Sequence, residues 1–154
     1  MDIVRPRDAR THALIGAGFD VHREVGPGFG EVVCRDAFAV ELQLRGIPFH
    51  TEVPFRVVYK GHRLPSVYRA DFVCYDSIIV EIKSLPVRTG PVEQAQMLRC
   101  LRSSGKQVAL LLNFGLPSLE YRRFVMDDVL VKPPTRTHAE SPSAEGRTRE
   151  EDAK

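Results

Sequence analysis

The apolar and polar positions between residues 9 and 126 change their period several times along the chain. Three stretches space their apolar residues as an amphipathic helix does, and short runs rich in Val, Ile, Phe and Tyr lie between them in the manner of strands. The predicted helices cover residues 9–24, 30–45 and 91–104. The predicted strands cover residues 50–59, 68–75, 78–83, 107–113 and 120–126.

Residues that favour helix ends mark several of these boundaries. Gly26-Pro27-Gly28 follows the first predicted helix, Gly46 follows the second, and Pro91 stands in the first turn of the third. Helices and strands interleave along the chain, with β-hairpins in the middle. This order predicts an α/β or α+β fold in which helices flank a central mixed β-sheet.

The stretch RADFVCYDSIIVEIKS, residues 69–84, places charged residues inside two apolar runs. Because successive side chains of a strand point to opposite faces, Glu81 and Lys83 share one face of the second run. Asp76 lies midway between Asp71 and Glu81, so a three-residue turn over 75–77 would set these two acids directly opposite each other. Two carboxylates at that separation repel unless a cation lies between them or one keeps its proton.

Two interpretations of this cluster are open from the residues alone. In the first, the carboxylates bind a divalent metal, and hard oxygen ligands of this kind suit Mg²⁺ or Mn²⁺. In the second, Asp71, Glu81 and Lys83 form an ordinary cross-strand charge cluster on a surface hairpin. The first is favoured because apolar residues flank the charges on both faces, which predicts a central strand where a buried charge needs a specific reason.

Composition restricts the function only slightly. The chain has 154 residues and a formal net charge of +2, which permits contact with a polyanion without requiring it. No apolar run approaches the roughly 20 residues that span a bilayer, and the N-terminus lacks the apolar core of a signal peptide, so we expect a cytoplasmic protein without membrane contact. Cys34, Cys74 and Cys100 are widely spaced, so we expect buried thiols rather than zinc ligands or disulfides.

The end of the chain differs in composition from the rest. From Pro133 onward it contains no Val, Ile, Leu, Phe or Tyr. Such a segment cannot bury enough apolar surface to offset the entropy of ordering it. We therefore expect an N-terminal extension over residues 1–8, a folded domain over 9–130 and a disordered polar tail over 131–154.

The charged motif is part of a wider resemblance to a known family. Asp71, followed after nine residues by Glu81-Ile82-Lys83, resembles the PD-(D/E)XK nuclease signature, with Ala70 in place of its proline. The segments GAGFDVHREVGPGFGEVVCRDAFAVELQLRGIPFHTEVPFRVVYKG and EQAQMLRCLRSSGKQVALLLNFG resemble the GxxExxY family, a bacterial group of that superfamily. The resemblance spans roughly residues 11–126 and implies a restriction-endonuclease-like core.

This resemblance implies an active site centred on the hairpin. Asp71 and Glu81 are the implied metal ligands, with the backbone carbonyl of Ile82 as a candidate third ligand. Lys83 is implied to orient the attacking water or to stabilise developing negative charge. The implied cofactor is Mg²⁺ or Mn²⁺, which would serve phosphodiester hydrolysis.

Two further site residues are implied on helices. Glu31, within the name motif that begins at Gly28, is implied to hold a second metal or its water shell, so it is a candidate both for catalysis and for metal binding. The spacing of an α-helix agrees, because Glu31 shares a stripe with apolar positions of residues 30–45. Gln96 is implied to touch the site, with a solvated helix face as the alternative. The family tyrosine is Cys34 here, and Glu93 stands where a His is common.

Several other polar residues have alternative roles. Glu41 falls within the apolar arc of its helix and is either a second inward carboxylate or, as we favour, a structural partner for a buried arginine such as Arg69. Asn113 terminates a buried strand, and the lone histidines His12 and His22 are interpreted as structural or exposed. Candidate phosphate contacts are Arg69, Lys60 and Arg63.

The sequence therefore favours a metal-dependent nuclease that acts on nucleic acid, with DNA preferred to RNA. A nuclease-fold module that binds nucleic acid or a protein partner without cutting is the first alternative. A structural α/β module, in which the charges form a salt-bridge network, is the second. A homodimer is left open, since enzymes that cut both strands of a duplex are commonly dimeric.

Overall fold

The computed structural model describes residues 8–126, which form a five-stranded sheet with its strands in chain order. Strands β3 and β4 are parallel, and the other neighbouring pairs are antiparallel. The elements are α1 (Ala9–Val25), α2 (Glu31–Leu44), β1 (Phe49–Tyr59), β2 (His62–Cys74), β3 (Ile78–Lys83), α3 (Pro91–Ser104), β4 (Val108–Asn113) and β5 (Glu120–Val125). The predicted mixed sheet flanked by helices is confirmed.

Each predicted helix and strand is present, and one strand is longer than predicted. Strand β2 begins at His62 rather than at residue 68. The extension follows from the turn before it, where Lys60 and Gly61 both have positive φ, 47° and 78°. Positive φ at both central residues is typical of a type I′ turn, whose twist matches that of the two strands it joins. The β1–β2 hairpin is therefore a long arm.

Parts of the predicted domain organisation lie outside the described residues. These parts are residues 1–7 of the expected N-terminal extension, residues 127–130 of the expected domain and the whole expected tail, 131–154. None of the helices between residues 8 and 126 has the length and apolarity needed to cross a membrane.

Local chemistry explains where the first helix begins and ends. The side chain of Asp8 accepts a hydrogen bond of 3.0 Å from the Arg10 N–H and so caps the N-terminus of α1. At the other end, Gly26 has a φ of 70° and donates its N–H to the His22 carbonyl over 2.8 Å. A glycine accepts this left-handed backbone at no steric cost, so the chain can leave the helix here.

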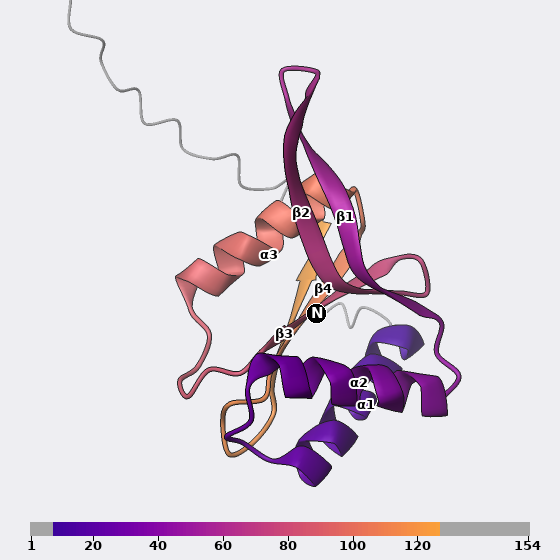
Figure 1. Ribbon diagram of the computed structural model, residues 1–154, viewed down its shortest axis with the longest axis vertical. Coiled ribbons are helices and arrows are strands. Elements are labelled where there is room, and N and C mark those ends of the chain that lie inside the picture. The colour runs from indigo at the N-terminus through magenta and orange to yellow at the C-terminus, as the bar shows by residue number, and fades with distance from the viewer. Residues whose placement is uncertain (1–7, 127–154) are drawn as a thin grey trace, which may run out of the picture.

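The helices cover both faces of the sheet (Figure 1). One apolar core lies between the sheet and the α1–α2 pair and contains Leu14, Phe38, Phe72 and Ile82. A second core lies on the face covered by α3 and contains Ile79, Met97, Leu101 and Leu111. Because β3 and β4 contribute to both cores, their residues are buried on both faces, as the apolar runs of the sequence predict.

The β1–β2 arm changes faces part-way along its length. Phe49 and Phe72 pack on the α1–α2 side, whereas Val53 and Ala70, which lie an even number of residues away, pack on the α3 side. The strand pairing is interrupted between these positions, and Glu52 has a φ of 50° there. The register is the same on both sides of Glu52, so no residue is inserted and the change of face accompanies this unusual backbone conformation. The outer part of the arm, which extends beyond the rest of the fold in Figure 1, therefore belongs to the α3 side.

Asn113 holds the loop that joins β3 to α3. Its side-chain oxygen accepts hydrogen bonds from the N–H groups of Leu85 (2.8 Å) and Gly115 (3.1 Å). Its side-chain nitrogen lies 3.3 Å from the Leu85 carbonyl oxygen and 3.1 Å from that of Val87, to which it donates. Asn113 is fully buried. It therefore does more than terminate β4, because it satisfies four backbone groups of the neighbouring loops.

Replacing this side chain is expected to destabilise the protein. Asn113→Ala leaves several buried backbone groups without partners, so the free energy of unfolding should fall by about 3 kcal/mol in urea denaturation. The exposed Gln107→Ala serves as the control and should change it by less than about 0.5 kcal/mol. A loss at Asn113 no larger than that of the control would contradict the proposed clamp.

Candidate active site

The turn between β2 and β3 is centred on Asp76. Cys74 pairs with Ile78, Val73 with Ile79 and Phe72 with Val80. Tyr75 and Asp76 both have a φ of 54°, and the Ser77 N–H donates to the Cys74 carbonyl over 3.1 Å. The predicted three-residue turn is therefore confirmed, and the same register places Asp71 opposite Glu81.

Backbone pairing between β2 and β3 ends where the two acids begin. The Asp71 N–H donates to the Glu81 Oε1 atom over 3.2 Å, and the Ile82 N–H donates to the Asp71 Oδ2 atom over 2.9 Å. Each carboxylate thus accepts a hydrogen bond from a backbone N–H of the opposite strand. This exchange holds both carboxyl groups in the gap between the strands and in contact with each other.

Two side chains from elsewhere in the fold fix these carboxylates. The Tyr68 hydroxyl, on the α3 side of β2, donates a hydrogen bond to Glu81. Arg35, on α2, forms an ion pair with Asp71, with 3.4 Å between Nη1 and Oδ1. A hollow of about 130 Å³ beside Asp71 is lined in part by Arg35 and Glu52. Asp71 can therefore be reached from solvent, whereas Glu81 is buried.

Burial makes it costly for Glu81 to carry a charge. Burial first, and then the negative charge of Asp71, raise the pKa of Glu81 to about 8. Burial also raises the pKa of the Tyr68 hydroxyl, and the charge of Glu81 adds to the effect. The Cys100 thiol on α3 lies beside this pair, and its burial raises its pKa to about 12. Without a cation in the gap, the site favours a proton on Glu81.

Lys83 lies two residues beyond Glu81, toward the N-terminal end of α3. The pKa of Glu93, in the first turn of α3, is lowered mainly by a hydrogen bond from the Gly90 N–H and also by the charge of Lys83. Within residues 8–126, no carboxylate forms a salt bridge with the Lys83 ammonium. Lys83 is half-buried, and Glu93 is the acid whose pKa its charge lowers.

The structure places the two other predicted residues at the margins of this cluster. Glu31 begins α2, close to Cys34, whose pKa is raised by burial and further by the charge of Glu31. Ser84, the residue after Lys83, interacts with the same thiol, so the start of α2 lies at the end of β3. Gln96 is half-buried on α3, and its side chain has no hydrogen-bond partner among the described residues.

The donor set of the cluster fits a hard divalent cation. Asp71 and Glu81 supply adjacent carboxylate oxygens. The candidate third ligand is the backbone carbonyl of Ile82, the residue whose N–H donates to Asp71. Oxygen ligands of this kind suit Mg²⁺ or Mn²⁺. In the described part of the chain, no three His, Cys, Asp or Glu side chains are arranged to hold a metal. Glu31 thus does not complete the pair as a direct third ligand in this arrangement.

Several predictions about neighbouring residues are confirmed or corrected. All three cysteines are buried and free. Glu41 has the structural role that was favoured, but its partner is Arg45, at 2.8 Å between Nε and Oε1, and not Arg69, which is exposed. The two residues stand at i and i+4, and Arg45 also pairs with Asp20, so they link α2 to α1. His22 is buried and lies 2.8 Å from the Leu116 carbonyl oxygen through Nε2, which is a structural contact.

The sequence analysis missed Tyr68 and Arg35. Both act on the acids through contacts that depend on the folded chain, since Arg35 is 36 residues from Asp71 and Tyr68 reaches Glu81 only after the arm changes faces. One signal was present for Arg35. Arg35 comes directly after Cys34 and lies on the side of the helix that the apolar pattern predicts to face the core. A charge on that side needs a partner.

Comparison with protein families now adds to this geometry. The model of the PD-(D/E)XK nuclease superfamily matches residues 8–124. The chain belongs to this superfamily. The matched range contains Asp71, Glu81 and Lys83. Its mixed five-stranded sheet with three helices is the nuclease fold of these proteins, and the substrate class that membership implies is nucleic acid.

Two solved structures resemble this fold. The crystal structure of SSO0001 is 14% identical in sequence, with a TM-score of 0.45, and the match covers 79% of this chain and 85% of that one. An alkaline exonuclease, LHK-Exo from Laribacter hongkongensis, is 16% identical, with a TM-score of 0.49, and the match covers 83% of this chain and 75% of that one. A search of the curated proteins found no match.

The raised pKa of Glu81 predicts how stability depends on pH in the presence of EDTA. The folded state keeps a proton up to about pH 8, whereas the unfolded chain releases it near the ordinary value of 4.5. The stabilising contribution is thus complete below pH 4.5 and is lost as the pH rises toward 8. Between pH 5 and pH 8 we expect the free energy of unfolding to fall by on the order of 3 kcal/mol.

Glu81→Gln tests this dependence, because the amide keeps an oxygen that can accept both hydrogen bonds but does not titrate. Urea denaturation of this variant should show a much flatter pH profile than wild type. Glu24→Gln, an exposed acid on α1, should keep the wild-type profile. An unchanged slope in Glu81→Gln would show that the proton is held elsewhere.

Proposed function

We propose that this protein is a metal-dependent nuclease that hydrolyses phosphodiester bonds, preferably of DNA rather than RNA. The observation that carries the proposal is the pair of carboxylates, Asp71 and Glu81, bonded reciprocally across the β2–β3 gap, with Lys83 two residues beyond Glu81. The chain belongs to a nuclease superfamily, and this membership supports phosphodiester hydrolysis as the reaction that the carboxylate pair would serve.

The proposed cofactor is Mg²⁺, with Mn²⁺ as its substitute. Asp71, Glu81 and the Ile82 carbonyl would hold it, and Glu31 would act on its water shell from the start of α2. When bound, such an ion neutralises phosphate charge, activates water and stabilises the leaving oxygen. Nucleases of this superfamily generally use divalent metals, which supports the assignment.

The remaining groups of the chain prepare and complete this site. Tyr68 orients the Glu81 carboxylate through its hydroxyl, and Arg35 orients that of Asp71. The Lys83 ammonium, which has no salt-bridge partner between residues 8 and 126, would orient the attacking water or stabilise charge on the phosphate. Gln96 would contact substrate or water from α3.

We also propose that the chain belongs to the GxxExxY group of the superfamily. Gly28, with a φ of 109°, and Glu31, which begins α2, support this placement. The buried free thiols support the cytoplasmic location expected from the sequence. We include a homodimer in the proposal, because enzymes that cut both strands of a duplex are commonly dimeric.

Cleavage assays test the activity itself. Wild type should degrade labelled single- or double-stranded DNA in Mg²⁺ or Mn²⁺, with RNA cut more slowly. Asp71→Ala removes a proposed metal ligand and Lys83→Ala removes the ammonium charge, so each should lower the rate at least about a hundredfold. Glu24→Ala, on the exposed side of α1, should cleave as wild type does. Activity that survives both site substitutions would overturn the assignment.

Metal binding provides a test that does not depend on activity. Mn²⁺ at a hundred times its dissociation constant should stabilise the wild-type protein by about 2.7 kcal/mol over EDTA, because only the folded state presents the two carboxylates together. Thermal denaturation with and without Mn²⁺ measures this gain. Asp71→Ala should lose most of it.

If Asp71→Ala keeps the full gain, the metal binds elsewhere. Metal binding by a wild type that cleaves no DNA or RNA would instead favour the non-cutting nuclease-fold module. The change from the family tyrosine to Cys34, buried at the start of α2 beside Ser84, is the observation that keeps this second candidate in view.

A further inference from the structure

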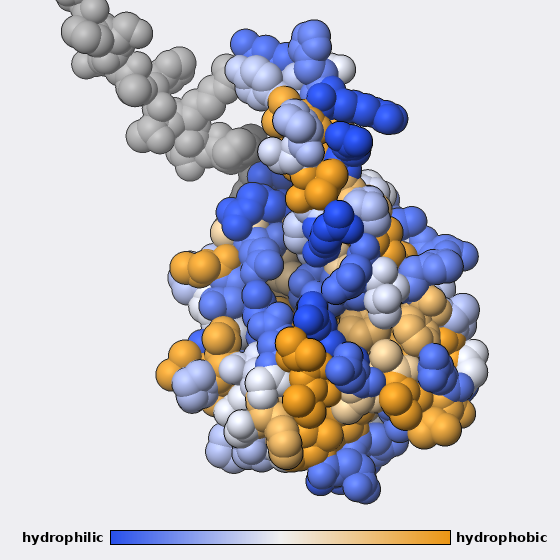
Figure 2. Space-filling model, in the orientation of Figure 1, coloured by the Kyte–Doolittle hydropathy of each residue, from blue (hydrophilic) through white to orange (hydrophobic). Residues whose placement is uncertain are grey.

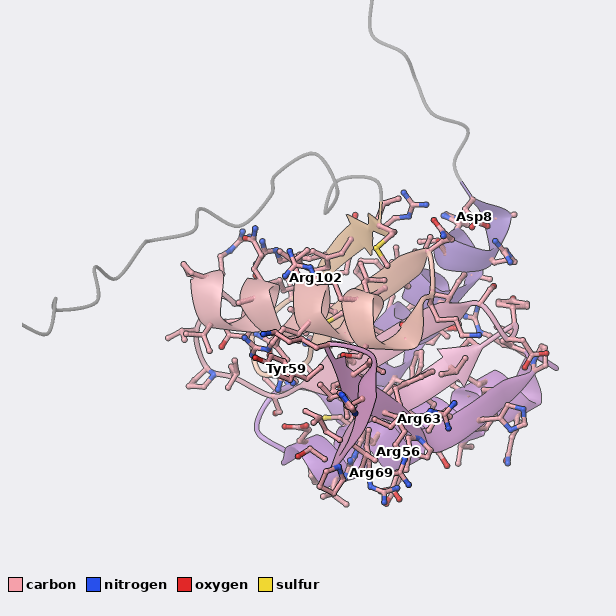
Figure 3. All side chains as sticks on the ribbon, turned by 90° about the horizontal axis from the view of Figure 1, so that it is seen from above. Asp8, Arg56, Tyr59, Arg63, Arg69 and Arg102 are labelled. Atoms are coloured by element: carbon pink, nitrogen blue, oxygen red, sulfur yellow. The ribbon has the colours of Figure 1, made fainter. Side chains whose placement is uncertain are left out.

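A groove outside the carboxylate pair runs between the β1–β2 arm and α3. It has a volume of about 450 Å³. Its lining residues are Arg56, Val57, Val58, Tyr68, Arg99, Arg102 and Ser103. Figure 3 shows Arg56 on the arm and Arg102 on α3, and in Figure 2 the arm carries mostly hydrophilic residues. The groove is therefore formed by two elements that meet only in the folded chain.

The charge of this groove has one sign. Three of its lining residues are arginines, and none is an aspartate or glutamate. Among residues 8–126, Arg56, Arg99 and Arg102 form no salt bridge, although Arg56 donates a hydrogen bond of 3.3 Å to the Leu64 carbonyl. Arg99 and Arg102 thus bring two guanidinium groups from α3 to a groove without a carboxylate, which favours an anionic ligand with more than one negative charge.

The groove meets the candidate active site at Tyr68. This side chain lines the groove, and its hydroxyl donates to Glu81. On the other side, Cys100 lies next to Arg99 in the chain and beside Tyr68 and Glu81 in the fold. The groove and the carboxylate pair therefore share the Tyr68 side chain.

Helix geometry gives the arginines of α3 a useful spacing. Arg99 and Arg102 are three residues apart, so their Cβ atoms are roughly 5–6 Å apart on one side of the helix. Gln96 precedes Arg99 by three residues and extends the same row toward the end of α3 that lies near Lys83. The row thus follows the direction from the outer groove to the active site and can contact successive phosphates of one strand.

We propose that this groove binds the sugar-phosphate backbone of a single nucleic-acid strand and directs it to Asp71 and Glu81, an inference that rests on the proposed function. The volume favours one strand over two, because about 450 Å³ holds no more than a short stretch of one chain. Basic grooves with an aromatic side chain are typical of single-strand binding.

Binding of short fluorescein-labelled oligonucleotides in EDTA tests the proposal without cleavage. Fluorescence anisotropy of the full chain is measured at several salt concentrations with single-stranded DNA, single-stranded RNA and a blunt DNA duplex. Arg99→Gln and Arg102→Gln should each weaken single-strand binding about tenfold. Each should also make the slope of log affinity against log salt shallower by about 0.7. Whichever single strand, DNA or RNA, binds with the higher affinity identifies the nucleic acid that the groove prefers.

Arg23→Gln is the matched control. It removes the same charge from α1, on the opposite side of the sheet, where Arg23 pairs with Asp20. Its affinity should equal that of wild type. Wild-type affinity in both groove variants would overturn the proposal, and so would equal losses in all three variants. Losses confined to the duplex would overturn the single-strand assignment. Far-UV circular dichroism checks that α3 stays helical.

Cleavage by wild type and Asp71→Ala, measured in parallel with Mg²⁺, separates this proposal from the proposed function. If wild type cleaves and the groove variants bind normally, the groove assignment fails and the nuclease function stands. If the groove variants lose binding as expected and wild type does not cleave, the nuclease function fails and the groove stands as a binding site.

Discussion

The reciprocal hydrogen bonds between Asp71 and Glu81 are the constraint on which the rest of the site depends. In an ordinary antiparallel pair, hydrogen-bonded and non-hydrogen-bonded positions alternate, so only one of the N–H groups of Asp71 and Ile82 would face the gap between β2 and β3. Here both bond to carboxylates, at 3.2 Å and 2.9 Å. The ladder that runs from Cys74 to Phe72 therefore stops, and the gap between the strands is filled by acid groups. The backbone remains satisfied while a polar pocket forms inside a central sheet.

This exchange has an electrostatic cost that the fold only partly offsets. Arg35 supplies one positive charge to Asp71 at 3.4 Å, and Tyr68 supplies a neutral donor to Glu81. Burial and the facing carboxylate still raise the pKa of Glu81 to about 8. A buried acid pair that keeps a proton for lack of a cation is poorly arranged for structural stability alone. It is well arranged to bind a divalent cation. That the pair suits cation binding better than structural stability is the physical argument for a functional site.

Local patterns were sufficient to predict the elements and the pairing of the two acids. The odd turn centred on Asp76 fixes the register, and a period of two then places Asp71 opposite Glu81. Pro91 gives the start of α3 correctly. The contacts of Tyr68, Arg35 and Asn113 could not be predicted in this way, because each joins residues that are adjacent only after the helices and loops have docked on the sheet.

The interruption at Glu52 and Asp71 shows why the site and the groove belong together. If the alternation of β2 had continued, Tyr68 would share a face with Phe72 and Cys74, which pack toward α1 and α2. Its hydroxyl would then point away from Glu81. Glu81 lies two residues after Ile79 on β3 and so shares the α3 side with it. A φ of 50° costs a residue such as Glu52 on the order of 1 kcal/mol.

The same break removes Asp71 from the ladder, turns Tyr68 toward Glu81 and brings the outer arm alongside α3. A continuous hairpin would provide none of these three features. Sheet geometry along the arm therefore decides whether the carboxylates have an oriented partner and whether a basic groove adjoins them. The interruption at Glu52 and Asp71 orients the partner of the carboxylates, and a register shift between Arg56 and Val58 shapes the arm where it lines the groove.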